Sequence, residues 1–92
     1  MRERTIEAYL RDEVKKIGGL ALKWVSPGNS GVPDRIVIVP GGRIVFVELK
    51  APGRKSTALQ QHQQNRLRAL GCDVRVIDSR EEVDELVREL RA

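Results

Sequence analysis

The chain has 92 residues, of which 40% are hydrophobic and 33% charged, and its net charge at pH 7 is +4. This length and composition predict one globular domain over residues 1–92 and exclude a largely disordered chain. Because no apolar run approaches the ~20 residues of a membrane span and no secretory signal is present, we expect a cytoplasmic protein with no membrane partner.

Charge is unevenly distributed along the sequence. Residues 43–75 contain seven basic and two acidic residues, whereas residues 78–92 contain six acidic and three basic ones. A basic middle segment is typical of a protein that contacts a polyanion, although a solvated basic surface explains the charge equally well. The single cysteine, Cys72, excludes an internal disulfide and a cysteine-cluster metal site, and we expect it to be a small buried residue.

The first half of the sequence predicts one helix and three strands. Apolar residues recur at helical spacing over residues 5–17, and two glycines follow. A short strand over residues 20–25 leads into a loop rich in Pro and Gly. Strands over residues 34–39 and 43–50 flank Pro-Gly-Gly at 40–42, which is a strong hairpin signal.

The second half predicts a helix, a strand and a closing helix. Thr57 can cap a helix over residues 58–70, with Gln60 completing a capping box. A strand over residues 73–77 follows, and Ser79 with Glu82 forms the same capping pattern before an amphipathic final helix. The order α-β-β-β-α-β-α predicts an α/β fold, with a mixed sheet of about four strands flanked by helices.

The predicted hairpin carries charges at the ends of its strands. Asp34 opens the first strand, and Glu48 and Lys50, which share a face, close the second. A three-residue turn would place Asp34 directly opposite Glu48, whereas a two-residue turn would send the two carboxylates to opposite faces unless a bulge restored the register. Since Pro40 has no N–H for a ladder bond, we expect it in the turn and predict the three-residue form.

Opposed carboxylates with Cβ atoms ~4.5–5.5 Å apart repel each other, so one would hold a proton or a cation would lie between them. Mg²⁺ takes one or two carboxylates together with water and a substrate phosphate. Lys50 could then orient or deprotonate the attacking water and stabilise charge on the phosphate. The alternative is an ordinary ion-pair cluster of Asp34, Glu48 and Lys50 at the end of a sheet.

The run SGVPDRIVIVPGGRIVFVELKAPGRKSTALQ resembles the virus-type replication-repair nuclease (VRR-NUC) domain of the PD-(D/E)xK nuclease superfamily. The matching pieces are Gly-Val-Pro-Asp ending at Asp34, Glu-Leu-Lys over residues 48–50, and Gln60, and the similarity extends to Asp78. This resemblance implies a restriction-endonuclease-like core. It also implies a metal-dependent DNA endonuclease that takes Mg²⁺ or Mn²⁺ and no small-molecule cofactor.

The same resemblance implies a role for each site residue. Asp34, Glu48 and the main-chain carbonyl of Leu49 would hold the metal ion, while Lys50 would position the attacking water. Gln60 would brace the site or contact the scissile phosphate, and it can serve as part of the helix cap as well.

An acid on the first helix often completes the metal site in this superfamily. Glu7, on the flank of the apolar stripe, is the preferred candidate, with Glu3 and Glu13 as competitors. An exposed ion pair between Glu7 and Arg11, four residues on, is the alternative role for that side chain.

The loops on either side of the site are expected to contact DNA, through Ser30 in the first and Arg54 and Lys55 in the second, although solvated loop charges are an alternative. His62 matches no part of the motif and is expected at the surface.

Stand-alone members of the family resemble junction resolvases. We therefore expect structure-selective cutting of four-way (Holliday) junctions by a homodimer. The alternatives are a flap, nicking or nonspecific DNA endonuclease, or a non-catalytic nucleic-acid-binding module of the same fold.

Overall fold

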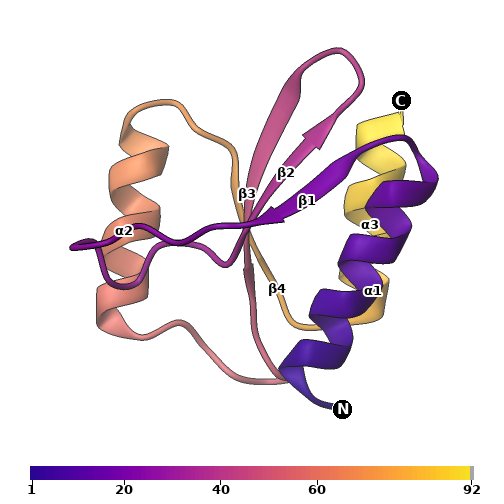
Figure 1. Ribbon diagram of the computed structural model, residues 1–92. Helices are drawn as coiled ribbons and strands as arrows, with labels where there is room; N and C mark the ends of the chain where they lie inside the picture. Colours follow the sequence, from indigo (N-terminus) through magenta and orange to yellow (C-terminus); the bar gives the residue numbers. More distant parts are fainter. Residues whose placement is uncertain (92) are drawn as a thin grey trace.

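The computed structural model describes residues 1–91 and contains the predicted order of three helices and four strands (Figure 1). The elements are α1 (Glu3–Lys16), β1 (Leu20–Lys23), β2 (Arg35–Val39), β3 (Arg43–Leu49), α2 (Ala58–Ala69), β4 (Val74–Ile77) and α3 (Arg80–Arg91). The strands lie in the order β1-β2-β3-β4, antiparallel up to β3, with β4 parallel to β3. The predicted α/β architecture with a mixed four-stranded sheet is therefore confirmed.

The sheet separates two unequal layers of helix. Figure 1 shows α1 and α3 together on one side of the sheet and α2 alone on the other. The hydrophobic core fills the α1/α3 side and is built from alternate strand residues, because side chains one residue apart point to opposite faces. Its fully buried members include Ile6, Leu10, Val14, Val37, Val45, Val47, Leu49 and Val83.

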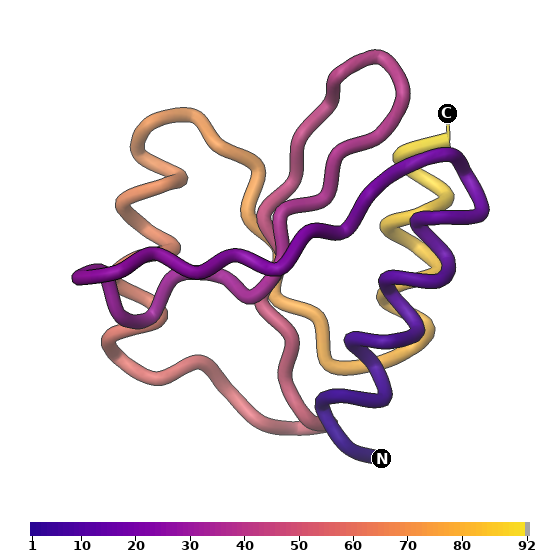
Figure 2. The backbone as a smooth tube through the Cα atoms, in the orientation of Figure 1, coloured from indigo at the N-terminus to yellow at the C-terminus, as the bar shows by residue number. Residues whose placement is uncertain are grey.

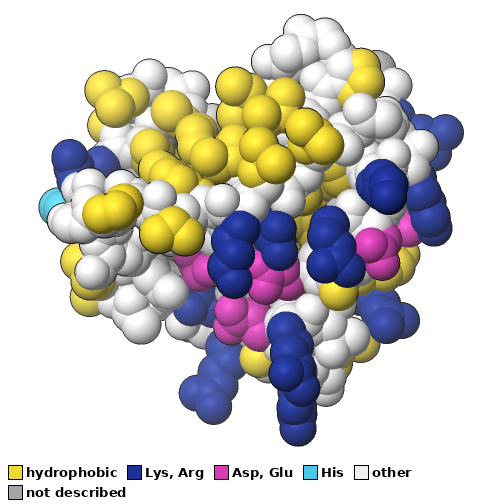
Figure 3. Space-filling view, in the orientation of Figure 1, with side chains coloured by type: hydrophobic (Ala, Val, Ile, Leu, Met, Phe, Trp, Pro, Cys, Tyr) yellow, Lys and Arg dark blue, Asp and Glu magenta, His cyan; other side chains and the backbone are white. Residues whose placement is uncertain are grey.

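The opposite face of the sheet is only partly covered. Leu20, Leu22 and Ile44 remain 58%, 46% and 48% exposed, respectively. Figure 3 shows an apolar surface spread over the upper part of this view, above a mixed group of basic and acidic side chains. One α-helix is narrower than a four-stranded sheet, so α2 leaves much of this apolar face open to solvent.

The hairpin between β2 and β3 has the three-residue turn that the sequence predicts. Val39 pairs with Arg43 and Arg35 pairs with Val47, so each pair of partner numbers has the same sum. Gly41 and Gly42 both have positive φ angles, 96° and 81°, which only glycine adopts without strain. One residue beyond the last ladder pair, the same register places Asp34 opposite Glu48.

The two predicted helix caps differ in outcome. At α2 the capping box is complete, since Gln60 N–H donates to Thr57 Oγ1 and Thr57 N–H donates to Gln60 Oε1. At α3, Glu82 N–H donates to Ser79 Oγ, but the Glu82 carboxylate accepts from the N–H of Asp78 instead of Ser79. In the second capping box, the backbone N–H that donates to the Glu82 carboxylate therefore belongs to the residue before the expected one.

Cys72 is free and half-buried, so it is less enclosed than the sequence predicts. Within residues 1–91, every helix is too short or too polar to cross a membrane.

Candidate active site

Asp34 is held at the end of β2 by its two neighbouring strands. Its main-chain carbonyl accepts a hydrogen bond from Trp24 N–H at 2.9 Å, and its carboxylate Oδ2 accepts from Leu49 N–H at 2.8 Å. The second bond fixes the carboxylate over the last residues of β3, where Glu48 lies. The hairpin register therefore determines the position of this side chain as well as that of the backbone.

Glu48 is a buried carboxyl group, only 1% exposed. Burial, followed by the charge of Asp34, raises its pKa from 4.5 to about 8, although the ammonium of Lys50 opposes the shift. Oε2 accepts from Gln60 Nε2 at 3.2 Å, whereas Oε1 is buried and has no hydrogen-bond partner among the described residues. An unpartnered buried carboxylate oxygen is costly, so such a group calls for a specific explanation.

Lys50 is positioned chiefly by an amide. Its Nζ donates to Gln60 Oε1 at 2.6 Å and lies 3.8 Å from Glu48 Oε2. Since Gln60 Oε1 also accepts from the Thr57 N–H, two donors fix the oxygen side of this amide and its NH₂ side faces Glu48. Gln60 therefore takes part in the helix cap and in the site simultaneously, as its two expected roles allow.

The carboxylate oxygens of Asp34 and Glu48 suit a hard divalent cation. A buried, unpartnered Glu48 oxygen beside a second carboxylate is a set of oxygen ligands of the kind that Mg²⁺ or Mn²⁺ binds. Across residues 1–91 there is no group of three or more His, Cys, Asp or Glu side chains arranged to hold a metal by themselves. Any cation here would therefore depend on main-chain oxygen, water or substrate to complete its coordination.

The three candidate acids of α1, Glu3, Glu7 and Glu13, have different surroundings. Glu7 Oε2 accepts from Arg35 Nε at 2.8 Å, and Glu13 pairs with Lys16 at 2.6 Å. Glu3 is the one coupled to the site, because burial and then the charge of Asp34 raise its pKa, while Lys50 lowers it. Glu7 is thus paired with Arg35 of β2, whereas the carboxyl group of Glu3 is influenced by the charges of Asp34 and Lys50.

The residue at which α1 begins decides whether Glu3 belongs to this helix. The sequence pattern predicts a helix from residue 5, which leaves Glu3 outside it, but α1 begins at Glu3. The alternative role for Glu7 also differs from expectation, since its partner is Arg35 rather than Arg11, and Arg11 lies 3.4 Å from Asp12.

The loop before Asp34 is packed tightly against α2. Gly31 has a φ angle of +88°, and a Cβ atom there would lie 3.0 Å from the Leu59 side chain, so this position requires glycine. Gln63 Nε2 donates to the carbonyl of Ser30 at 3.1 Å and ties the loop to the same helix that carries Gln60. Figure 2 shows the chain leaving β1 toward α2 and returning to β2.

The loop after Lys50 presents its basic residues to solvent. Arg54 and Lys55 are both exposed, and Gly53 N–H donates to Asp78 Oδ2 at 3.1 Å, which holds the loop against the end of β4. His62 is also exposed, as expected. Sequence reasoning missed the structural parts of Gln63 and Asp78, whose partners are 33 and 25 residues away along the chain.

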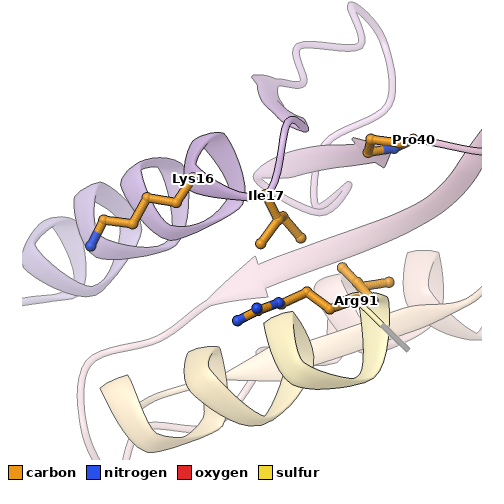
Figure 4. A pocket seen from close by; sticks show the side chains of 5 residues that line it. Lys16, Ile17, Pro40 and Arg91 are labelled. Carbon is orange, nitrogen blue, oxygen red and sulfur yellow. The ribbon is translucent and has the colours of Figure 1, made fainter.

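A hollow of about 490 Å³ lies elsewhere, between the C-terminal ends of α1 and α3 and the residue that opens the hairpin turn (Figure 4). It is lined by Lys16, Ile17, Pro40, Leu90 and Arg91. None of these side chains is acidic, and Lys16 is at the opposite end of α1 from Glu3. We therefore do not assign this hollow to the carboxylate site.

Comparisons with known proteins give the family. No family sequence model matches the chain. It is 56% identical over 81 residues, which is 88% of this chain and 87% of the relative, to "Putative nuclease p44" of Acyrthosiphon pisum secondary endosymbiont phage 1. It also superposes on a solved structure described as a VRR_NUC domain with a TM-score of 0.87 and 36% identity, covering 94% of each chain. The chain belongs to the virus-type replication-repair nuclease (VRR-NUC) family.

Proposed function

We propose that this VRR-NUC nuclease is a metal-dependent DNA endonuclease that hydrolyses phosphodiester bonds at Asp34, Glu48 and Lys50. The observation that carries the proposal is the buried Glu48 carboxyl group, which has one unpartnered oxygen and a pKa raised to about 8 by burial and by Asp34. Perturbed carboxyl groups beside a lysine are typical of catalytic centres. A purely structural ion pair would instead leave both oxygens of Glu48 partnered.

In this proposal Asp34 and Glu48 hold Mg²⁺ or Mn²⁺ together with the main-chain carbonyl of Leu49, and Glu3 replaces Glu7 as the nearby acid from α1. When bound, such a cation lowers the pKa of water and stabilises negative charge on a phosphate. Oxygen ligands do not distinguish strongly between Mg²⁺ and Mn²⁺, so either can serve.

Lys50 and Gln60 act on the reacting groups themselves. The Lys50 ammonium, held by Gln60 Oε1, has further N–H donors that can orient the attacking water or stabilise the charge that develops on the phosphate. Because the Thr57 N–H fixes the Gln60 oxygen, the Lys50 ammonium is already held in place before the reaction. Ser30, Arg54 and Lys55 lie on the two loops that flank the site and are the proposed phosphate contacts.

We further propose that the enzyme is selective for DNA structure and acts as a homodimer on four-way junctions. Support for a dimer comes from the open apolar sheet face, which includes Leu20, Leu22 and Ile44 (Figure 3). Exposed apolar areas of this kind commonly mark protein contacts, and a two-fold dimer needs only one self-complementary face. Two active sites related by a two-fold axis would suit a substrate with two equivalent strands.

Cleavage assays test the activity. Four-way junctions, flaps and linear duplexes with labelled strands are incubated with Mg²⁺ or Mn²⁺ and wild type, Asp34→Ala or Asp12→Ala. Asp12 is a matched control because it is an exposed acid on the same protein. We expect wild type and Asp12→Ala to cut and Asp34→Ala to be inactive. If Asp34→Ala cuts as well as wild type, the proposed site is wrong. If wild type prefers flaps, or cuts all the substrates equally, it is a flap or nonspecific endonuclease instead of a junction-selective one.

Sedimentation at micromolar concentration tests the dimer. We expect wild type to sediment as a dimer and Leu22→Glu, which places a charge on the open face, to sediment as a folded monomer. A wild-type monomer that still cuts junctions symmetrically would contradict the dimer. DNA binding without any cleavage would favour the non-catalytic alternative.

A further inference from the structure

A second, smaller hollow lies next to the carboxylate site on the side of α2. Its volume is about 190 Å³, and it opens between the loop after β1 and the second half of α2. Its apolar walls come from Trp24, Leu67 and Leu70, and its polar lining from Ser26, Asn29 and Arg66. The hollow thus combines an aromatic ring and aliphatic groups with a few hydrogen-bond donors, one of them permanently charged.

The two parts of the chain that line this hollow, the segment after β1 and helix α2, also contact the carboxylate site. Trp24 N–H donates to the carbonyl of Asp34 at 2.9 Å, so the two residues are direct neighbours across the β1–β2 pair. On the other side, α2 carries Gln60 in its first turn and Leu67 seven residues later, which is about 10 Å along the helix axis. A strand whose phosphate lies at the carboxylates can therefore reach the hollow within a few nucleotides.

The rim of the hollow is unusually apolar for an open surface. Leu70, one of the residues that line the hollow, is 82% exposed. Trp24 is itself half-buried, and its ring contacts that of Phe46 with a centroid distance of 5.2 Å, so it is braced from one side. A braced aromatic ring beside exposed aliphatic groups offers a flat apolar ligand a ready surface at little entropic cost.

We propose that this hollow binds one unpaired nucleobase of the DNA substrate. Nucleobases combine a flat apolar face with hydrogen-bonding edges, and proteins that bind single strands stack such faces on aromatic side chains. The Asn29 NH₂ group already donates to Ser26 Oγ and to the carbonyl of Pro27, which leaves the Ser26 hydroxyl proton and the Asn29 side-chain oxygen to meet the base edge. The exposed Arg66 can contact a neighbouring phosphate. The proposal rests on the proposed function as a DNA nuclease, and it gives that function a physical basis for preferring DNA that carries an unpaired base, such as a flap, over a blunt duplex.

A second copy of the chain is the competing occupant of this region. The hollow itself is concave and small and has both apolar and polar lining groups, which fits a base better than the flat sheet face that includes Leu20 and Ile44. The two surfaces are also separable, because the residues proposed for the dimer are not among those that line the hollow. Both can therefore be tested in one protein.

Trp24 is the only tryptophan of the chain, so intrinsic tryptophan fluorescence reports on the surroundings of this one ring in the hollow. Wild-type protein in EDTA, where no metal-dependent cleavage occurs, is titrated with three probes. These are a blunt duplex, the same duplex with a single-stranded flap, and that flap duplex with abasic sites in the flap. We expect the flap duplex to quench Trp24 emission and to bind about tenfold more tightly than the other two probes.

Arg66→Ala should weaken flap binding severalfold, whereas Arg88→Ala, an exposed arginine on α3, should leave it unchanged. Leu70→Asn changes an exposed side chain and should fold normally while losing the preference for the flap over the abasic probe. Equal affinity for the intact and abasic flaps, or quenching by the blunt duplex, would overturn the proposal. So would Trp24 emission that changes with protein concentration in the absence of DNA in Leu22→Glu as well as in wild type, because a second copy would then cover the hollow itself.

The outcomes also separate this proposal from the proposed function. If DNA binds and is cut with metal but Trp24 does not respond, only the nucleobase site fails. If no DNA binds and none is cut, the proposed function fails and the nucleobase site fails with it.

Discussion

The raised pKa of Glu48 makes the stability of the metal-free protein depend on pH. Burial and Asp34 raise this pKa from 4.5 to about 8, so between these values the native state binds more protons than the unfolded state. Stability must therefore fall as pH rises through this range. Glu48→Gln removes the titration while keeping the size of the side chain and an N–H that can replace the carboxyl proton.

The size of the effect follows from the same two pKa values. Integrated from pH 6 to pH 9, a native pKa near 8 lowers the free energy of unfolding of wild type by roughly 2–3 kcal/mol. For a domain of this length each kcal/mol corresponds to about 4–8 °C in Tm. We therefore expect Glu48→Gln to match wild type at pH 6 and to exceed it by about 10 °C or more at pH 9.

Thermal unfolding followed by circular dichroism in EDTA measures this difference directly. Glu85→Gln, an exposed acid on α3, is the control and should follow wild type at every pH. Excess Mg²⁺ should restore wild type at pH 9, because a cation replaces the missing proton, and should leave Glu48→Gln unchanged. If the Tm difference between wild type and Glu48→Gln is the same at pH 6 and pH 9, the carboxyl group does not titrate as described and the argument fails.

Four further predictions concern the neighbouring groups. Mn²⁺ affinity, measured by calorimetry, should fall as pH is lowered below about 8, with proton release on binding; a pH-independent affinity would mean that Glu48 is not a ligand. Lys50→Met should reduce cleavage ~100-fold or more at unchanged Mn²⁺ affinity, and a loss of affinity instead would make it a structural residue. Glu3→Gln should weaken Mn²⁺ binding, whereas Glu7→Gln should lower stability by ~1 kcal/mol through loss of the Arg35 pair; the reverse pattern would restore Glu7 to the site. Gly31→Ala should lower both Tm and cleavage, since its φ angle is +88°, and a wild-type Tm would show that the loop adapts.

The parts of the site that lie close together in sequence were predictable. Strand side chains alternate with a period of two, so the number of residues in the turn decides whether Asp34 and Glu48 share a face. Pro40 cannot donate to a ladder bond, and this single chemical fact favoured the three-residue turn. The Thr57–Gln60 cap was likewise predictable because both partners lie within one helical turn.

The parts that depend on packing between distant elements were not predictable in the same way. Whether Glu7 or Glu3 faces Asp34 depends on where α1 begins and how it is rotated on the sheet, and Arg35 captures Glu7 from a strand 28 residues away. The contact of Gln63 with Ser30 has the same character. Local periodicity identifies the buried side of a helix but does not determine which flanking polar residue meets which partner.

The amide of Gln60 links the start of a helix to the orientation of Lys50. Its oxygen accepts from both Thr57 N–H and Lys50 Nζ, and its nitrogen donates to Glu48. The amide therefore cannot reach its working position until the first turn of α2 has formed and packed beside β3. A nascent or partly unfolded chain thus lacks an ordered Lys50, so in the proposed mechanism the hydrolytic site forms only in the same step as native folding.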